Sequence, residues 1–420
     1  MELKKLETRE LKELLNYFQR IHPRQTDLNL SRMERVLKAL GSPHTHLPPT
    51  IHVAGTNGKG STISYLRHIY EAANLNVHVY TSPHLIRYNE RIRLSGKLIT
   101  DEALTFFLNQ VKQANENHEL TFFEAKTAAA FLAFQAQPAD VLLLETGLGG
   151  RLDATNIVDA PVACVLTPIS IDHQDFLGET LAEIAQEKAG IIKRGAKVFI
   201  SQQAIEVRQI LIDKANQCGA GVVELDLTQK YTFPQPQLAG EHQIQNARLA
   251  AAIAFELRDQ LLVTEAAIAR GIENTQWPGR LQRLPVGDLC PTDDVDVWID
   301  GAHNEHGFRV LNNFIHSIQE KRQRPLIMGV AMLKNRDPEL FFNIFSEVVD
   351  AFVFIAMHEA ERFHAPEFLA TYIEKASEIV PIEQLNKFFQ KKQVDEPRIF
   401  LTGSLYLVGK VLELNKTTLE

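Results

Sequence analysis

The chain has 420 residues, more than one hydrophobic core usually holds, so its length predicts two domains. Its net charge of −8 argues against a general nucleic-acid surface, and no apolar stretch reaches the roughly 18 residues that span a bilayer. Three widely spaced cysteines form neither a disulfide framework nor a zinc site, and the N-terminus lacks the apolar segment of a secretory leader, so we expect a cytoplasmic protein.

Strand patterns alternate with helical patterns through the first part of the chain. The β-rich runs occupy 49–55, 76–82, 139–147, 161–169 and 196–202. This alternation predicts an α/β fold with a mostly parallel sheet that helices cover on both faces. Before the third of these strands, Thr121 and Glu124 form a capping box, and we interpret the phenylalanines of the helix that follows as core.

The composition and periodicity of the sequence change near residue 277. Segment 277–296 is rich in Pro, Gly and Asp and has no sustained period, which is typical of a connector. The alternation then restarts with four strand candidates, in DVWIDGAHN, PLIMGV, AFVFIA and RIFLTGS. We therefore expect one domain over 1–280 and a second, smaller α/β domain over 281–420.

The run IHVAGTNGKGST combines a strand, a glycine-rich loop and the start of a helix. The predicted loop comprises Gly55, Thr56, Asn57, Gly58, Lys59, Gly60 and Ser61. Glycines let backbone N–H groups approach phosphate oxygens at a helix N-terminus, and Lys59 would reach the outer phosphates. A common phosphate-binding loop has Ser or Thr directly after the lysine, where this chain has Gly60. The alternative is a glycine-rich turn that binds nothing.

Two oxygen-bearing side chains follow neighbouring strands, where doubly wound sheets bind their ligands. Ser82 would be an ordinary loop serine, but the absent hydroxyl at Gly60 leaves a magnesium ligand to be supplied from a neighbouring strand end. Glu145 follows a buried strand directly, which is costly unless the carboxylate is paired or metal-bound. Magnesium prefers such hard oxygen ligands, whereas the alternative is a salt bridge with Arg151.

The segment DHQDFLGETLAEIAQEKAG contains two more candidates. A capping box at 180–183 predicts a helix from about 181, and Lys188 then falls on its apolar face. Burial lowers the pKa of a lysine and makes its neutral amine available, but helical spacing equally allows a lysine that reaches the surface. His173 is a core or capping histidine or a metal ligand, and its position leaves these alternatives open.

Nine motifs together identify a family. They are HVAGTNGKGS, YTSPHL, NERI, LETGLGGRLDATN, DHQDFLG, AQEKAGIIK, NARLAAA, WPGR and DGAHN. From about residue 15 to the C-terminus, the chain resembles the folate-dependent members of the Mur ligase superfamily, the dihydrofolate synthases and folylpolyglutamate synthases. The resemblance implies a P-loop, Mur-ligase-like central domain and a smaller Rossmann-like C-terminal domain.

The resemblance also implies a reaction. A carboxylate takes the γ-phosphate of ATP to give an acyl phosphate, and the amino group of L-glutamate attacks it to form an amide. The acceptor is 7,8-dihydropteroate in the first activity and the γ-carboxylate of a reduced folate in the second. Two Mg²⁺ ions neutralise the phosphates and the developing charge. The family default is a monomer whose partners are these small molecules.

Residue roles follow from the family motifs. Ser82 and Glu145 hold the first magnesium, so the hydroxyl displaced from the loop is a family feature. His173 holds the second, and Lys188 is carbamylated in relatives, which turns a buried cation into a carboxylate-like anion. With Lys59, these two residues form the implied catalytic set. Implied contacts to ATP come from Asn246, Arg280, Asp300 and His303.

Pteroate binding in the bifunctional bacterial enzymes involves three segments. Here they are Asp27-Leu28-Asn29-Leu30, Thr121-Phe122-Phe123-Glu124 and Leu152-Asp153-Ala154. Asn29 replaces a glycine of the family pattern, and because Asn tolerates left-handed backbone we expect the loop to keep its shape. We infer the bifunctional enzyme from this N-terminal segment.

Three alternatives remain. A cell-wall Mur ligase would usually carry Thr directly after the loop lysine, and Gly60 counts against it. A folylpolyglutamate synthase without the first activity would differ in the pteroate pocket alone. A non-catalytic nucleotide-binding module would not need Glu145, His173 and Lys188 together.

Overall fold

The computed structural model describes residues 8–22, 28–223, 233–290, 296–375, 377–392 and 396–417. The chain divides into two compact units, Met1–Gln237 with Ile244–Gln276, and Leu238–Gln243 with Trp277–Glu420. Each unit is built on its own β-sheet. Within the described ranges, no helix combines the length and the apolar character needed to cross a membrane.

The first unit contains an eight-stranded sheet and most of the helices. Its strands are β1 (Thr50–Ala54), β2 (Val77–Tyr80), β3 (Ile92–Leu94), β4 (Lys97–Leu98), β5 (Val141–Glu145), β6 (Ala163–Leu166), β7 (Lys197–Ile200) and β8 (Gly221–Val223). Its α-helices are α1 (Arg9–Arg20), α2 (Ser31–Ala39), α3 (Lys59–Ala72), α4 (Asp101–Asn115), α5 (Phe122–Ala136), α6 (Gln174–Leu177), α7 (Leu181–Ala189), α8 (Ile205–Cys218), α9 (Glu241–Glu256), α10 (Arg258–Leu261) and α11 (Glu265–Glu273). Short 3₁₀ turns are η1 (Pro43–His46), η2 (Tyr88–Arg91) and η3 (Ala154–Ile157).

The strand order of this sheet places β1 at a topological switch point. The order is β4-β3-β2-β5-β1-β6-β7-β8, and the pairs are parallel except at the β2-β3-β4 edge. The chain passes from β1 to β2 and β5 on one side, then crosses to β6 on the other side of β1. The five strands predicted in this part of the sequence and the mostly parallel sheet are confirmed. Ligands of doubly wound folds bind outside the carboxyl ends of the strands at such a point.

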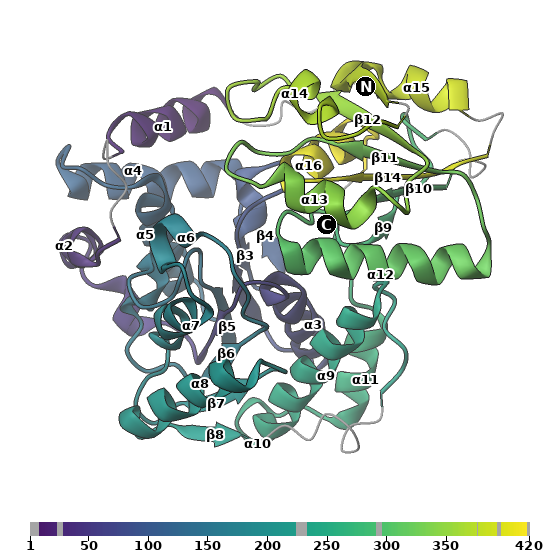
Figure 1. Cartoon of the computed structure of the whole chain (residues 1–420). Helices are drawn as coiled ribbons and strands as arrows, with labels where there is room; N and C mark the ends of the chain where they lie inside the picture. The colour runs from purple at the N-terminus through teal and green to yellow at the C-terminus, as the bar shows by residue number, and fades with distance from the viewer. Residues whose placement is uncertain are drawn as a thin grey trace. The chain divides into compact units, whose positions relative to one another are not determined.

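Helices cover both faces of this sheet, as expected for parallel strands with apolar residues on both sides. On one face, Leu142 and Leu144 of β5 join the core formed with α1, α2, α4 and α5, while Cys164 and Leu166 of β6 pack with α7 and α8. On the other face, α3 contacts β1, β2 and β5, and α11 packs on α3. Figure 1 shows α5, α7 and α8 on one side of the sheet and α3, α9 and α11 on the other.

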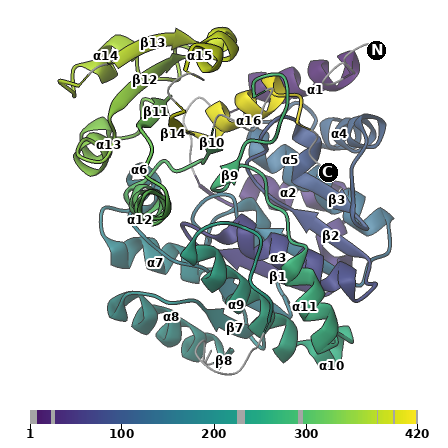
Figure 2. The ribbon, with the colours of Figure 1, turned by 90° about the vertical axis from the view of Figure 1, so that its right-hand side faces the viewer.

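The second unit is a smaller α/β structure on a six-stranded sheet with the order β13-β12-β11-β14-β10-β9. Its strands are β9 (Gln282–Arg283), β10 (Asp296–Ile299), β11 (Leu326–Val330), β12 (Ala351–Ala356), β13 (Ser377–Pro381) and β14 (Arg398–Thr402). Its helical elements are α12 (Glu305–Lys321), α13 (Pro338–Phe345), α14 (Pro366–Ala370), η4 (Ile382–Gln384), α15 (Leu385–Lys392) and α16 (Leu405–Leu414). Figure 2 shows this sheet between α13 and α16.

The four strands predicted for the second unit are confirmed, but the predicted connector is partly wrong. Within 277–296, residues 282–283 form β9, which pairs antiparallel with β10 at the edge of the second sheet. A strand of two residues has no detectable period, so the prolines and glycines around it dominate the sequence pattern. The short strands β3, β4 and β8 and the edge strand β13 were also not predicted.

The contact between α3 and α11 depends on a glycine. A Cβ built on Gly271 would lie 2.3 Å from Cα of Ile69, so the backbones of the two helices approach too closely for any side chain. Ser64 of α3 donates its hydroxyl to the carbonyl of Gln276 just beyond α11, at 2.7 Å. This pairing fixes α3, whose first turn begins at Lys59.

We predict that Gly271→Ala destabilises the protein, because one helix must move away from the other and a packed core tolerates such shifts poorly. The loss should be about 1 to 3 kcal/mol in the free energy of unfolding. Gly221→Ala is the matched control, since a Cβ there has nothing within 4 Å and its backbone is not left-handed. Urea unfolding of both variants measures the difference, and equal stability would contradict the packing argument.

Candidate active site

The loop after β1 is held against the end of β6. Gly55 has a φ of 151°, and a Cβ there would lie 1.9 Å from Oγ1 of Thr167. The N–H groups of Thr56 and Asn57 both donate to the carbonyl of Pro168, at 2.9 and 3.2 Å. Thr56 also donates its hydroxyl to the carbonyl of Ser170, at 3.0 Å. Only glycine fits at residue 55, so this residue type is explained by a close approach within the loop.

Lys59 and Asn246 complete the loop. Nζ of Lys59 donates to the carbonyls of Gly55 at 3.0 Å and Thr56 at 3.3 Å, so its ammonium group lies over the loop. Gly58 is left-handed, with φ 86°, and a Cβ there would lie 2.8 Å from Oδ1 of Asn246 on α9. The structure therefore brings Asn246 of α9, which is 188 residues after Gly58 in the chain, to the loop. The arrangement of strand, glycine loop, lysine and helix N-terminus is suited to a phosphate chain.

Ser82 and Glu145 lie together beside this loop. Glu145 pairs in register with Val53 of β1, two residues before Gly55. The N–H of Ser82 donates to Oε2 of Glu145 at 2.9 Å, although the glutamate side chain is only 3% exposed. Arg151, the alternative partner for Glu145, instead pairs with Glu187 at 2.8 Å. The salt bridge between Glu145 and Arg151 is therefore not formed.

Lys188 is brought to the same edge by two glycines. A Cβ on Gly150 would lie 2.6 Å from the carbonyl oxygen of Glu187 and 2.9 Å from Cα of Lys188. A Cβ on Gly190 would lie 2.4 Å from Cα of Arg151. The loop after β5 therefore rests directly on the last turn of α7. This contact explains Gly150 of the motif LETGLGG and Gly190 of the motif AQEKAGIIK in physical terms.

The surroundings of Lys188 lower its pKa enough for both the neutral and the charged form to be populated near pH 7. The side chain is buried, as the helical spacing allowed, and does not reach the surface. Burial first, and the ammonium group of Lys59 second, lower the pKa of Lys188 to about 7. Nearby carboxylates, Asp172 foremost, act in the opposite direction. A neutral amine in this position is able to react with CO₂.

His173 follows the end of β6 in a left-handed conformation, with φ 53°. Its N–H donates to Oδ1 of Asp172 at 2.8 Å, and its ring nitrogen Nε2 lies 3.9 Å from the same oxygen. The histidine side chain is 39% exposed, which excludes the alternative of a core histidine. Its imidazole is thus accessible to a ligand.

The donor set fits magnesium bound to a nucleotide. Among the residues that the structure describes, no group of three or more His, Cys, Asp or Glu side chains could form an all-protein metal cage. Magnesium commonly takes one or two carboxylates and completes its shell with water and phosphate oxygens. The buried carboxylate of Glu145 beside Ser82, next to a phosphate loop, provides this kind of incomplete shell. The accessible imidazole of His173 provides a second donor.

The predicted acceptor segments lie next to Glu145. The ring of Phe123 occupies the place where a side chain on Gly147, two residues after Glu145, would be, with its closest atom 2.4 Å from that Cβ. Thr121 and Glu124 form the predicted capping box, and Glu124 also pairs with Arg32 of α2 at 3.0 Å. The capping interpretation is therefore confirmed.

Asp153 and its neighbours Leu152 and Ala154 shape the loop after β5. Oδ2 of Asp153 accepts from the N–H of Leu148 at 2.8 Å, and Oδ1 accepts from the N–H of Thr155 at 3.0 Å. Burial raises the pKa of Asp153, while these hydrogen bonds lower it. The carboxylate thus braces the loop against which Phe123 lies.

The N-terminal segment differs from our expectation at one residue. Asp27 lies outside the described residues, and Leu28 packs partly buried against the core formed with α7 and α8. Asn29 is not among the residues with left-handed backbone. Its Oδ1 instead accepts from the N–H and the hydroxyl of Ser31, at 3.2 and 2.7 Å. The side chain of Asn29 therefore forms a hydrogen-bonded turn before α2. The left-handed backbone expected at this position is not needed.

Within the second unit, Arg280, Asp300 and His303 also lie together. Asp300 is buried and accepts from the N–H groups of Leu281 and Ala302, both at 2.8 Å. Burial raises the pKa of Asp300, and the nearby Arg280 lowers it. Nδ1 of His303 lies 2.8 Å from the carbonyl oxygen of Gly301, which directs the ring. The predicted ATP contacts of this unit thus form one polar cluster.

Two residues of the site were missed in the sequence. Asp172 is buried and acts on Lys188, and Ser170 accepts from the side-chain amide of Asn57 at 3.2 Å. Both follow β6, so the rule that ligands bind at strand ends would have found them.

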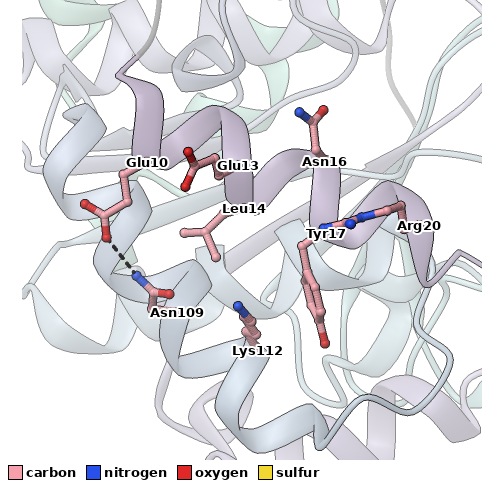
Figure 3. Close-up of a pocket in the computed structure, with 8 residues that line it drawn as sticks. All are labelled: Glu10, Glu13, Leu14, Asn16, Tyr17, Arg20, Asn109 and Lys112. Carbon is pink, nitrogen blue, oxygen red and sulfur yellow. Dashed lines mark hydrogen bonds between the residues drawn. The ribbon is translucent and has the colours of Figure 1, made fainter.

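A separate groove lies between α1 and α4 and contains none of the predicted site residues. It has a volume of about 710 Å³ and is lined mainly by polar side chains. Figure 3 shows Lys112 of α4 beside Tyr17 of α1, with the lysine Nζ 4.7 Å from the centroid of the tyrosine ring. The groove is lined by two acidic residues, Glu10 and Glu13, and two basic residues, Arg20 and Lys112, so it has no overall charge preference.

Comparison with known proteins gives consistent matches. Residues 53–233 match the model of the Mur ligase middle domain, and residues 288–414 match that of the dihydrofolate synthetase C-terminal domain. A dihydrofolate synthase/folylpolyglutamate synthase of Bacillus subtilis is 31% identical over 413 residues, covering 91% of this chain and 94% of the relative.

Two solved structures have the same fold over nearly the whole chain. The Escherichia coli FolC in complex with DHPP and ADP has a TM-score of 0.84 and 32% identity, and covers 96% of this chain and 97% of its own. The Yersinia pestis bifunctional folylpolyglutamate synthase/dihydrofolate synthase, complexed with AMPPNP and Mn ion, has a TM-score of 0.83 and 29% identity. That match covers 98% of this chain and 99% of the other.

We predict that Lys188 forms a carbamate whose amount depends on pH. The neutral amine adds CO₂ and releases a proton, whereas the ammonium form, which predominates below the pKa of about 7, does not react. With ¹³C-labelled bicarbonate, a carbamate signal should be present in the NMR spectrum at pH 8 and decline as the pH falls through 7. Lys188→Gln should lack the signal and Lys38→Gln, at an exposed lysine of α2, should retain it. A signal that persists in Lys188→Gln would refute the assignment.

Proposed function

This chain belongs to the family of dihydrofolate synthases and folylpolyglutamate synthases, and we propose that it ligates L-glutamate to dihydropteroate and to reduced folates with ATP. The family match covers 91% of the chain. The observation that carries the proposal is the edge of the first sheet, where a phosphate loop, the Ser82–Glu145 contact and the buried Lys188 converge. A protein that only bound a nucleotide would not need all three of these features.

The proposed reaction begins with ATP in the β1–α3 loop. The loop N–H groups bind phosphate oxygens, and Lys59 exchanges its bonds to the loop carbonyls for bonds to the outer phosphates. Two magnesium ions, held by Ser82 and Glu145 and by His173, would supply charge neutralisation for the phosphates. Asn246 closes the loop from α9. In the second unit, Arg280, Asp300 and His303 are the proposed further contacts to ATP.

Bond formation then takes two steps. The acceptor carboxylate, held along Phe123 next to Glu145, attacks the γ-phosphorus of ATP and displaces ADP, giving an acyl phosphate. The neutral amino group of L-glutamate attacks the acyl carbon, loses a proton and displaces inorganic phosphate. A carbamate on Lys188 would add a negative charge that offsets the ammonium group of Lys59.

The acceptor site is proposed on Leu28, Asn29 and the segments 121–124 and 152–154 of the first unit. We assign the acceptor site and the ATP contacts up to Arg280 to a domain over 1–280, and those of Asp300 and His303 to a domain over 281–420, although Arg280 falls in the second compact unit of the fold. A monomer in the cytoplasm, without nucleic-acid or membrane partners, stays a prediction. The second candidate is a folylpolyglutamate synthase without the first activity, because Asn29 differs from the family glycine.

We predict ATP-dependent turnover with both acceptors. Purified protein with ATP, magnesium and L-glutamate is given 7,8-dihydropteroate in one reaction and a reduced monoglutamyl folate in the other. Phosphate release and mass spectrometry should show each product heavier by one glutamyl unit. Turnover with the folate alone would leave the second candidate, and no turnover with either acceptor would refute the ligase proposal.

We also predict that Glu145→Gln lowers kcat/KM for both acceptors by about 100-fold or more, with a higher magnesium requirement, because an amide removes the negative ligand. Glu187→Gln is the matched control, since this carboxylate lies beside the same loop but pairs with Arg151. Its activity should remain within about threefold, in line with the small contribution of exposed ion pairs. Equal losses in the two variants would assign Glu145 a structural role.

A further inference from the structure

Lys126 is a buried cation on α5 that the proposed reaction does not use. Its side chain is 6% exposed, and its Nζ lies 3.8 Å from the centroid of the Phe122 ring and 5.0 Å from that of Tyr88. Phe122 and Lys126 are four residues apart and therefore share one face of the helix. Phe122 and Tyr88 are partly exposed, whereas Lys126 is buried beneath them. We call Lys126 and these two rings the aromatic enclosure.

Among the described residues, no carboxylate pairs with this ammonium group. Glu124, two residues before Lys126, pairs with Arg32, and Glu90, two residues after Tyr88, accepts the N–H groups of Leu85 and Ile86. Burial lowers the pKa of Lys126 well below its usual value. The two aromatic rings offset only part of the cost of burying an ammonium group, so an anion bound beside Lys126 would favour its charged form and supply the remaining compensation.

A second cation reinforces the positive character of this place. Nε of Arg91 donates to Nδ1 of His84 at 2.9 Å, and its guanidinium carbon lies 5.9 Å from the centroid of the Tyr88 ring. The His84 ring lies 4.3 Å from that of Tyr88. Arg91 also lowers the pKa of Lys126, which confirms that the two cations lie near each other. The enclosure therefore attracts an anion.

The enclosure adjoins both the acceptor segment and the metal ligands. Phe122 precedes Phe123, which rests on the loop after Glu145. His84 is two residues after Ser82, whose N–H binds Glu145. An acceptor whose reacting carboxylate lies at Glu145 would thus pass the rings of residues 122 and 123 and the group around Lys126.

Resting on the proposed function, we propose that Lys126 binds the carboxylate of a folate acceptor that does not react. A folate ending in glutamate presents two carboxylates, of which the γ-carboxylate is phosphorylated and the α-carboxylate remains negative. Dihydropteroate has a single carboxylate, and that one reacts. A buried ammonium group between aromatic rings supplies the charge-assisted hydrogen bond that the α-carboxylate needs on leaving water. Lys126 is thereby a specificity residue for the second activity.

The test compares Lys126→Met, which keeps the length and removes the charge, with the wild-type chain and with Lys112→Met. The control removes a second lysine of this unit that lies over an aromatic ring, in the groove between α1 and α4 (Figure 3). KM and kcat are measured for dihydropteroate, for a reduced monoglutamyl folate and for the same folate with its α-carboxylate converted to a carboxamide.

In Lys126→Met, KM for the folate should rise about 10- to 100-fold, the worth of a lost charge-assisted hydrogen bond, with kcat within about threefold. KM for dihydropteroate should change less than about threefold. The carboxamide should cost the wild-type chain a similar factor and cost Lys126→Met nothing further, because the interaction is already absent. Lys112→Met should behave like the wild type with all three acceptors. The melting temperature of Lys126→Met should not fall, since a buried amine without a carboxylate partner among the described residues has been removed.

Equal rises in KM for dihydropteroate and folate would overturn the proposal, because they would show a role common to both acceptors. So would a carboxamide penalty that is as large in Lys126→Met as in the wild type. If the proposed function is wrong, the wild-type chain will turn over none of the acceptors. Turnover by the wild-type chain therefore shows that a negative result concerns the role of Lys126 alone.

Discussion

The parallel pairing of β1 with β5 on one side and β6 on the other is the constraint on which the site depends. Val53 is in register with Glu145, and Ala54 is in register with Leu166. Three chain segments therefore end at one edge of the sheet, one carrying the phosphate loop, one a carboxylate and one the turn with His173. Hydrogen bonding between strands sets these positions, and the helices on both faces keep them from shifting.

Close backbone approach is the second condition. Gly55 fits under Thr167, and Gly150 allows the loop after β5 to rest on α7 at Lys188. A side chain at either place would separate the loop from the segment that it contacts. The two glycines therefore act by allowing close backbone contact. The buried carboxylate of Asp153 then braces one of these loops from inside.

Two buried lysines in the first unit illustrate how surroundings decide chemistry. Burial and the ammonium group of Lys59 lower the pKa of Lys188 to about 7, while Asp172 and Asp153 offset part of that shift. Lys126 has aromatic rings and another cation around it instead. Both side chains cost free energy when charged and buried, but the first has carboxylates of the chain for compensation. The second depends on an anion from outside, which links its cost to the binding of a substrate.

Local pattern in the sequence was sufficient for the long elements and for the residues at strand ends. Apolar runs predicted the parallel strands, capping boxes predicted the starts of α5 and α7, and glycine spacing predicted the phosphate loop, because these features arise from neighbouring residues. Tertiary structure alone decided what depends on distant residues. It placed Asn246 on the loop, paired Arg151 with Glu187 in place of Glu145, and recruited residues 282–283 into a sheet. In FFEAKTAAAFLAF the sequence predicted only a core role for the phenylalanines and did not single out Lys126, since burial without a carboxylate partner is a property of the folded surroundings and leaves no local pattern.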